Sequence, residues 1–220
     1  SSIITYKKML DNNILANYGK IEYWEERYAR RPEPFDWYQV YSGIKEIISP
    51  YMTKNDKILN IGCGNSRLSE DLSEEGYEDI TNIDFSNKVI SIMEEKCKAK
   101  YPKMSFKVMD VLDMKDFQTG TFNTVIDKGT LDSVLCGDNS VPNAQKMISE
   151  VFRVLVPGGH YICITYGDPE HRKKFLETQQ WGNLAVDKIQ KPSTTVSATM
   201  NADENDLKNF HYIYTMTKAK

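Results

Sequence analysis

The sequence predicts an α/β fold in which a mainly parallel sheet is covered by helices. Short apolar runs that suit buried parallel strands recur along the chain, beginning at 57–61. Most of these runs are followed by apolar residues at helical spacing. The first run ends on a Gly-x-Gly turn, and three later ones end directly on an aspartate. Strands and helices that alternate in this way form units with parallel strands.

The composition is that of an ordinary folded protein of 220 residues, most simply one large domain. Hydrophobic residues make up 40% of the chain and charged residues 27%, so a sizeable core can be buried. The net charge of −3 argues against a surface that coats nucleic acid, because such surfaces are usually basic. No apolar run approaches the length of a membrane span. We therefore expect neither a nucleic acid nor a membrane as partner.

The cysteines predict no metal site and no disulfide framework. They show no Cys-x-x-Cys spacing, and the three histidines do not cluster with them. Reduced thiols are typical of cytoplasmic proteins, and the N-terminal residues show no apolar signal segment. We therefore expect a cytoplasmic location and no bound metal.

Residues 1–50 are expected to form an N-terminal helical arm and lid in front of a single globular unit at 51–220. Scattered apolar positions at 3–18 suggest a loose amphipathic arm. A short helix is predicted over 21–28, and the prolines that follow end it. A second helix is predicted to open in an aromatic cluster and to run to about Ser49.

Three aromatic residues of this arm are candidates for a lid over a ligand, namely Trp24, Tyr28 and Trp37. Aromatic residues at helical spacing usually belong to the core, and that interpretation suits their aromatic neighbours. These three precede a ligand-binding turn, where an N-terminal lid would lie. A cationic ligand would favour aromatic faces within about 6 Å.

The first strand, at 57–61, leads through the glycine turn into a helix predicted over roughly 65–75. The second strand, at 77–84, ends on Asp84, which lies 22 residues after Gly62 (84 − 62). A carboxylate about 20 residues beyond a glycine turn can accept hydrogen bonds from a ribose diol.

Two further strands also end on carboxylates. The strand at 105–109 precedes Asp110, and the strand at 122–126 precedes Asp127. Ligands of open α/β sheets bind at the carboxyl edge of the strands. One such aspartate often only caps a helix, but three in succession predict a nucleotide-like ligand, with Asp110 at the base edge.

The remaining elements continue the alternation of helices and strands. They are a helix capped by Ser86 that extends to about Ala99, a helix at 143–154, a strand at 161–165, a helix from about His171, and strands at 181–189 and 210–217. The last two strands alternate in polarity, as antiparallel additions at a sheet edge do. Residues 191–206 are rich in Ser, Thr, Asn and Asp and are expected to form a mobile loop.

Two cofactor classes fit these carboxylates, the nicotinamide dinucleotides and S-adenosylmethionine. A dinucleotide needs a third glycine to complete Gly-x-Gly-x-x-Gly. The bulky Arg67 occupies that position. S-adenosylmethionine has no phosphate and makes no such demand, and a second carboxylate at Asp110 suits its adenine amino group. The residues therefore favour S-adenosylmethionine.

The chain resembles the seven-strand S-adenosylmethionine-dependent methyltransferases in its series Leu-Asn-Ile-Gly-Cys-Gly-Asn-Ser, Asn-Ile-Asp-Phe-Ser, Val-Met-Asp-Val, Ile-Asp-Lys-Gly-Thr-Leu-Asp and Arg-Val-Leu-Val-Pro-Gly-Gly. With Tyr-Trp-Glu-Glu-Arg-Tyr and Phe-Asp-Trp-Tyr upstream, it is similar to the group of elongation factor 1-alpha lysine methyltransferase 4 and the N-terminal domain of methyltransferase-like protein 13. The resemblance covers roughly residues 20–167. It implies a Rossmann-like sheet of seven strands, parallel except for one C-terminal strand, with helices on both faces.

The resemblance also implies a set of cofactor-binding residues: Trp24, Tyr28, Trp37, Gly62, Gly64, Asp84, Phe85, Asp110, Val111 and Lys128. The aromatic side chains at its start would close over the cofactor, and the glycine turn would leave room for its methionine part. Asp84 would bind the ribose hydroxyls, with Phe85 beside the adenine. Asp110 and the backbone of Val111 would read the adenine edge. Lys128 would contact the amino-acid end of the cofactor through its backbone, or would otherwise be a solvated loop charge.

Methyl transfer from S-adenosylmethionine to an amine leaves S-adenosylhomocysteine as product. The enzyme's main task in this reaction is to position the two reactants and to exclude water from them. A free lysine has a pKa of about 10.4, so the site must favour the neutral amine or take up its proton. Three residues near the sheet edge could orient the incoming nitrogen, namely Asp127, Asp132 and Tyr166. Asp132 has an alternative role, since it could simply hold its own loop in place.

The leading interpretation is a protein-lysine methyltransferase that acts on elongation factor 1-alpha. A small-molecule methyltransferase and a cofactor-binding module without turnover are the alternatives, and the intact carboxylates weigh against the second of these. The target residue, the degree of methylation and the oligomeric state are left open by the sequence.

Overall fold

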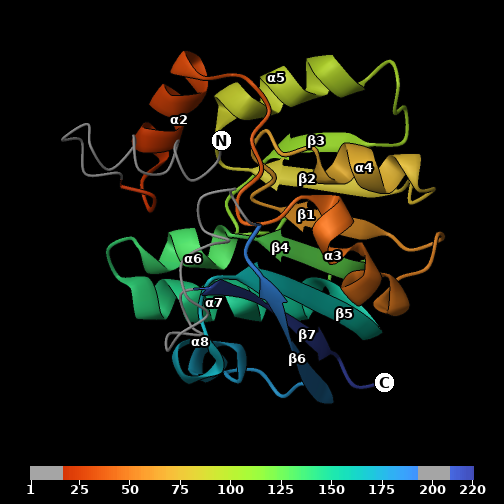
Figure 1. Cartoon of the computed structure of the whole chain (residues 1–220), viewed down its shortest axis with the longest axis vertical. Helices are drawn as coiled ribbons and strands as arrows, with labels where there is room; N and C mark the ends of the chain where they lie inside the picture. Colours follow the sequence, from red (N-terminus) through yellow and green to blue (C-terminus); the bar gives the residue numbers. More distant parts are fainter. Residues whose placement is uncertain (1–16, 193–208) are drawn as a thin grey trace, which may run out of the picture.

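The computed structural model describes residues 17–192 and 209–220, and its centre is a seven-stranded sheet with the order β3-β2-β1-β4-β5-β7-β6 (Figure 1). The strands are β1 (Ile58–Ile61), β2 (Ile80–Asp84), β3 (Ser105–Val108), β4 (Phe122–Lys128), β5 (Leu155–Thr165), β6 (Asn183–Gln190) and β7 (Phe210–Thr217). Strands β1 to β5 pair in parallel, and β7 runs antiparallel to both β5 and β6. The predicted sheet, parallel except for one C-terminal strand, is confirmed.

Helices cover both faces of this sheet, as predicted. They are α2 (Ile21–Arg30), α3 (Tyr41–Ile48), α4 (Leu68–Glu74), α5 (Asn87–Cys97), α6 (Thr130–Leu135), α7 (Ser140–Val154) and α8 (Pro169–Leu176), with a 3-10 turn η1 at Ser49–Tyr51. One apolar cluster joins the sheet to α2, α3, α4 and α5, and a second joins it to α6, α7 and α8.

Alternation along the strands explains the two clusters. Successive side chains of a strand point to opposite faces of its sheet. In β1, Ile58 packs into the first cluster, whereas Leu59 and Ile61 pack into the second. Every residue of β1 is buried, so its apolar run reflects a strand that is covered on both sides.

Several boundaries differ from the predicted ones. Strand β5 begins at Leu155 and includes the Pro157-Gly158-Gly159 segment, whereas the predicted strand begins at 161. The pairing of β4 with β5 shifts register between Phe122, which pairs with Leu155, and Thr124, which pairs with His160. The extra residues of β5 form a bulge at this point. Helix α7 begins at Ser140, three residues before the predicted start at 143.

Two segments near the glycine turn were also predicted differently. Helix α3 begins only at Tyr41, and the residues 35–40 before it carry no helical turn. The short helix α6 after Gly129 was not predicted. Most of the expected amphipathic arm at 3–18 and of the loop at 191–206 lies outside the described residues.

Within residues 17–192 and 209–220, no helix is long and apolar enough to cross a bilayer. The same segments contain no group of three His, Cys, Asp or Glu side chains that could hold a metal ion. All four cysteines carry free thiols.

Helix α7 provides a test of the second apolar cluster. Ile148 is fully buried against the sheet, whereas Val141 at the start of the helix is 50% exposed. We expect Ile148→Ala to lower the free energy of unfolding by about 2–5 kcal/mol, because it leaves a cavity. Val141→Ala should change it by about 0.5 kcal/mol or less, as exposed positions usually do. Urea denaturation of both variants measures the difference, and equal effects would contradict this packing.

Candidate functional site

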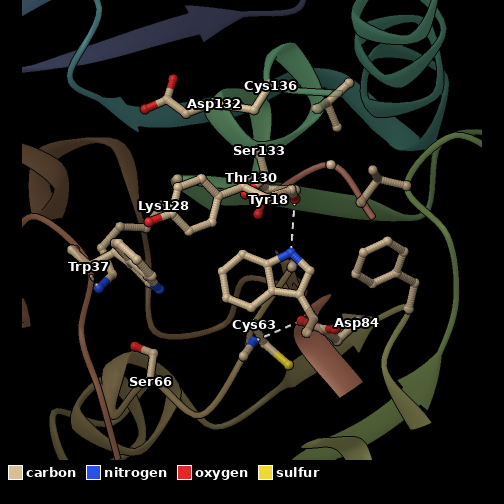
Figure 2. Close-up of a pocket in the computed structure, with 18 of the residues that line it drawn as sticks. Tyr18, Trp37, Cys63, Ser66, Asp84, Lys128, Thr130, Asp132, Ser133 and Cys136 are labelled. Carbon is tan, nitrogen blue, oxygen red and sulfur yellow. Dashed lines mark hydrogen bonds between the residues drawn. The ribbon is translucent and has the colours of Figure 1, made fainter. Parts of the chain in front are cut away.

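A cavity of about 280 Å³ lies at the carboxyl ends of the parallel strands, beneath the N-terminal segment that precedes α3 (Figure 2). Of the residues predicted for the site, all but Asp127 line this cavity. The fold therefore gathers the strand-end carboxylates, the glycine turn and the aromatic residues of the arm around a single space.

Asp84 is held at the end of β2 by two backbone groups. Its Oδ2 accepts a hydrogen bond from the Gly64 N–H at 3.0 Å, and its Oδ1 accepts one from the Ser86 N–H at 2.9 Å. The side chain is buried, and this burial raises its pKa to about 6 although both backbone donors oppose the shift. A carboxylate fixed in this way can accept further hydrogen bonds from ligand hydroxyls that reach into the cavity.

The glycine turn is required by the protein's own packing. Gly62 has φ +59°, and a Cβ placed on it would lie 2.0 Å from Thr130 Oγ1. That hydroxyl donates to the Ile61 carbonyl at 2.9 Å, which fixes Thr130 against the turn. A Cβ on Gly64 would lie 2.8 Å from the hydroxyl of Tyr28. The missing side chains thus make room for Thr130 and Tyr28, whereas the sequence predicted room for a ligand.

The aromatic residues of the arm form one packed group over the cavity. The Trp24 indole N–H donates to the Tyr18 carbonyl at 2.8 Å. The ring of Trp24 stacks on Tyr28, with centroids 5.8 Å apart, and meets Trp37 edge-on at 6.0 Å. Trp24 and Tyr28 also belong to the first apolar cluster. These rings are therefore both part of the core and part of the cavity wall.

Lys128 is buried, so its interpretation as a solvated loop charge is wrong. Its Nζ donates to Asp36 Oδ1 at 2.8 Å and to the carbonyls of Trp37 and Gln39 at 2.9 and 3.0 Å. Burial lowers the pKa of Lys128, and the Asp36 carboxylate opposes this shift. Ser66 also donates to Asp36. The ammonium group therefore ties the end of β4 to the segment before α3.

Asp127 lies under the cavity wall and does not line it. Its carboxylate accepts hydrogen bonds from the N–H groups of Thr130 and Leu131 and from the Tyr161 hydroxyl at 2.7 Å. The group is fully buried, which raises its pKa to about 6. The structure thus places Asp127 as a cap for α6, away from any position where it could touch an incoming nitrogen.

Asp132 lines the cavity, but both of its oxygens are engaged. Oδ1 accepts from the Thr165 hydroxyl at 2.5 Å and from the Arg172 guanidinium at 3.0 Å. Oδ2 accepts from the Tyr38 hydroxyl at 2.7 Å and from the Tyr166 N–H at 3.2 Å. Of the two roles considered from the sequence, this geometry favours the structural one, because the carboxylate fixes groups around it. Tyr166 is 47% exposed at the cavity rim.

Sequence reasoning missed three residues of the site. Asp36 and Tyr38 lie within the Phe-Asp-Trp-Tyr motif, and Thr130 lies within Asp-Lys-Gly-Thr-Leu-Asp. Their motifs had been noticed, but their contacts join segments roughly 70 to 95 residues apart in the chain. Only the fold brings such partners together.

A family model described as a methyltransferase domain matches residues 52–215. The chain belongs to this methyltransferase family. The matched range contains every strand of the sheet and the glycine turn with its carboxylates. This family is the one that the sequence motifs predicted.

Two named relatives are similar in sequence to this chain. The mouse "eEF1A lysine and N-terminal methyltransferase" is 42% identical over 160 residues, which are 71% of this chain and 23% of the mouse protein. The chain therefore spans only a fraction of that relative. The bovine "EEF1A lysine methyltransferase 4" is 33% identical over 177 residues, which cover 76% of this chain and 69% of the bovine protein.

Solved structures share the fold at low sequence identity. A SAM-dependent methyltransferase from Methanosarcina mazei has a TM-score of 0.59 at 21% identity, and the match covers 84% of this chain and 99% of that one. The Haemonchus contortus phosphoethanolamine N-methyltransferase 2, in complex with S-adenosylhomocysteine, has a TM-score of 0.61 at 15% identity and covers 96% of this chain and 59% of its own. At such identities, these likenesses support the fold alone.

The cavity fits S-adenosylmethionine better than a dinucleotide. Lys128 is the one basic side chain among the described residues that line it, and Asp36 already neutralises its charge. Arg67 is half exposed and pairs with Glu70 and Asp71 of its own helix. The described residues that line the cavity thus offer a pyrophosphate no basic side chain that is not already paired. Carboxylates and aromatic rings instead suit a ligand with a positively charged sulfur.

The packing of Gly62 can be tested against a matched glycine. Gly120 has a similar φ of +67° but nothing within 4 Å of an added Cβ. Alanine at either position should cost about 1–2 kcal/mol for the left-handed backbone. Gly62→Ala should lose about 1–3 kcal/mol more from the clash with Thr130. Urea denaturation compares the two variants, and equal losses would show that Thr130 does not restrict the turn.

The burial of Asp84 predicts a pH-dependent cofactor affinity. Only the ionised carboxylate can accept both ribose hydroxyls, and its pKa in the free protein is about 6. Affinity should therefore be constant above about pH 7 and fall toward tenfold per pH unit below 6. Calorimetry with S-adenosylhomocysteine between pH 5 and 8 measures this. Asp84→Asn should bind weakly at every pH, and a variant that keeps the wild-type profile would refute the assignment of Asp84.

Proposed function

We propose that this chain methylates lysine side chains of a protein, with S-adenosylmethionine as methyl donor and elongation factor 1-alpha as the substrate. The observation that carries the proposal is the similarity to relatives named as eEF1A lysine methyltransferases, at 33–42% identity over 71–76% of this chain. A cytoplasmic location, predicted from the free thiols, belongs to the same proposal.

The lining residues suggest how the cofactor lies. Asp110 beyond β3 would receive the adenine, and Asp84 at the end of β2 the ribose. The turn after β1 would then face the methionine part. Because β4 and β5 follow β1 in the sheet, the acceptor would approach from the side of Gly129 and Tyr166.

The chain's own residues have a limited chemical task. The cofactor supplies a methyl group on a positively charged sulfur, which keeps the electron pair of the broken carbon–sulfur bond when an amine attacks. Trp24, Tyr28 and Trp37 would shield the bound cofactor from water. Asp84 and Asp110 orient the nucleoside. The amine must arrive neutral, and its remaining proton leaves to solvent.

Methyl transfer to recombinant elongation factor 1-alpha tests the proposal. We expect radiolabel from S-adenosylmethionine to appear on that protein, and mass spectrometry to locate it on a lysine. Asp84→Ala should reduce labelling at least 100-fold, because it removes the ribose acceptor. The control Asp113→Ala changes an exposed aspartate outside the cavity and should label like the wild type.

Two results would contradict the proposal in different ways. Label on another protein of a recombinant panel, but not on elongation factor 1-alpha, would reject the substrate and keep the activity. Transfer only to small amines, with no protein labelled, would reject protein methylation.

A further inference from the structure

Tyr38 has an unusual backbone conformation for a tyrosine. Its φ is +64°, in the left-handed region that L side chains rarely adopt, and the one other such non-glycine residue in the described segments is Asn139. Bulky residues persist there when their surroundings enforce the conformation, and such positions cluster at functional sites. The observation raises the question of what holds Tyr38 and what it does for the site.

Lys128 enforces this conformation. Its buried ammonium donates to the carbonyls of Trp37 and Gln39, the two neighbours of Tyr38 in the chain. It also pairs with Asp36, one residue further back. The Gln39 N–H donates to the Trp37 carbonyl at 2.7 Å, which completes a tight turn around Tyr38. One cation therefore holds the backbone on both sides of this residue.

A second buried ion pair holds the other end of the same side chain. The Tyr38 hydroxyl donates to Asp132 Oδ2 at 2.7 Å, and Asp132 is only 3% exposed. Arg172, itself 6% exposed, fixes this carboxylate through Nε and Nη2. Tyr38 is thus fixed at its backbone by one buried ion pair and at its hydroxyl by another.

The ring of Tyr38 lies at the acceptor end of the cavity. A Cβ on Gly129, just after β4, would come within 3.3 Å of it. Tyr166, just after β5, meets it edge-on with centroids 6.2 Å apart. All three residues line the cavity, on the β4–β5 side and away from Asp84 and Asp110.

We propose that Tyr38 binds the acceptor amine and orients it toward the methyl donor, with Tyr166 as the facing wall of the acceptor channel. This inference rests on the proposed function and deepens it. Because the Tyr38 O–H is donated to Asp132, the phenolic oxygen acts toward any further group only as an acceptor. An amine N–H is the donor that matches it, and the two aromatic faces suit the aliphatic stem and nitrogen of a lysine.

In this arrangement Asp132 and Lys128 are positioning residues that act through Tyr38. Asp132 keeps the hydroxyl proton pointing away from the amine, so that an oxygen lone pair faces the amine. Lys128 keeps the ring over the β4–β5 side of the cavity. Neither needs to touch the substrate.

The test uses n-butylamine, which has the stem and nitrogen of a lysine side chain. It is titrated by NMR into the full protein saturated with S-adenosylhomocysteine. Tyr38→Phe keeps the ring and removes only the oxygen, and we expect it to weaken amine binding at least fivefold. Its affinity for S-adenosylhomocysteine should stay within twofold. With elongation factor 1-alpha as substrate, kcat should fall at least tenfold while KM for S-adenosylmethionine stays unchanged.

Tyr101→Phe is the matched control. Its hydroxyl donates to the Glu74 carboxylate at 2.6 Å, the same kind of bond outside the cavity. This variant should bind butylamine and turn over like the wild type, and the thermal midpoints of both variants report whether folding has changed.

The inference is overturned if Tyr38→Phe binds butylamine as tightly as the wild type, or if the wild type shows no amine binding in this cavity. It survives if the amine result holds but elongation factor 1-alpha is not methylated, in which case the proposed substrate fails alone. If the protein does not bind S-adenosylhomocysteine, the proposed function fails. The butylamine titration of the ligand-free wild type and of Tyr38→Phe then decides whether Tyr38 binds the amine.

Discussion

A single buried ammonium group determines how the N-terminal segment meets the sheet. Lys128 extends from the end of β4 and reaches the Asp36 carboxylate and two backbone carbonyls. Removing one partner of a buried ion pair commonly costs about 3–5 kcal/mol, because the other charge is left without compensation. The Lys128–Asp36 pair therefore holds the aromatic segment that forms one wall of the cavity. Without this contact the cavity would lack one wall, and the strand-end carboxylates would face open solvent.

The electrostatic character of the cavity follows from the same pairing. Lys128 is neutralised within the protein, and the other charged side chains among the described residues that line the cavity are carboxylates, next to aromatic rings. A sulfonium and an alkyl amine are both compatible with such surroundings. Phosphate groups are not compatible with these surroundings. This property distinguishes the site from that of a dinucleotide-binding sheet, whose first strands have the same order.

The sequence predicted the sheet and most of the cavity lining for a simple reason. Strands β1, β2 and β4 are short, mostly buried segments rich in Ile and other apolar residues, and glycine or aspartate marks their ends, so the sequence pattern locates them. Side chains at those ends must share one edge of a parallel sheet. Asp84 and Asp110 could therefore be placed before any coordinates existed.

What could not be predicted are the contacts between distant segments. Lys128 looked like a loop charge because nothing in its neighbourhood reveals Asp36, which lies 92 residues away. Asp127 and Asp132 looked alike, but Asp127 caps α6 while Asp132 faces the cavity. Helix α6 has only six residues, too few for a periodic signal. Each of these features depends on packing between elements.

The close packing of Thr130 against Gly62 changes what can be concluded from this glycine when related sequences are compared. The Thr130 hydroxyl leaves no room for a side chain at position 62, so a relative that has lost its activity should still retain this glycine in order to fold. Asp84 carries different information, because burial raises its pKa although two backbone N–H groups stabilise its charged form, and none of the ion pairs among the described residues includes it. A degenerate, inactive copy of this domain would be recognised by an intact glycine turn together with a replaced aspartate at the end of β2.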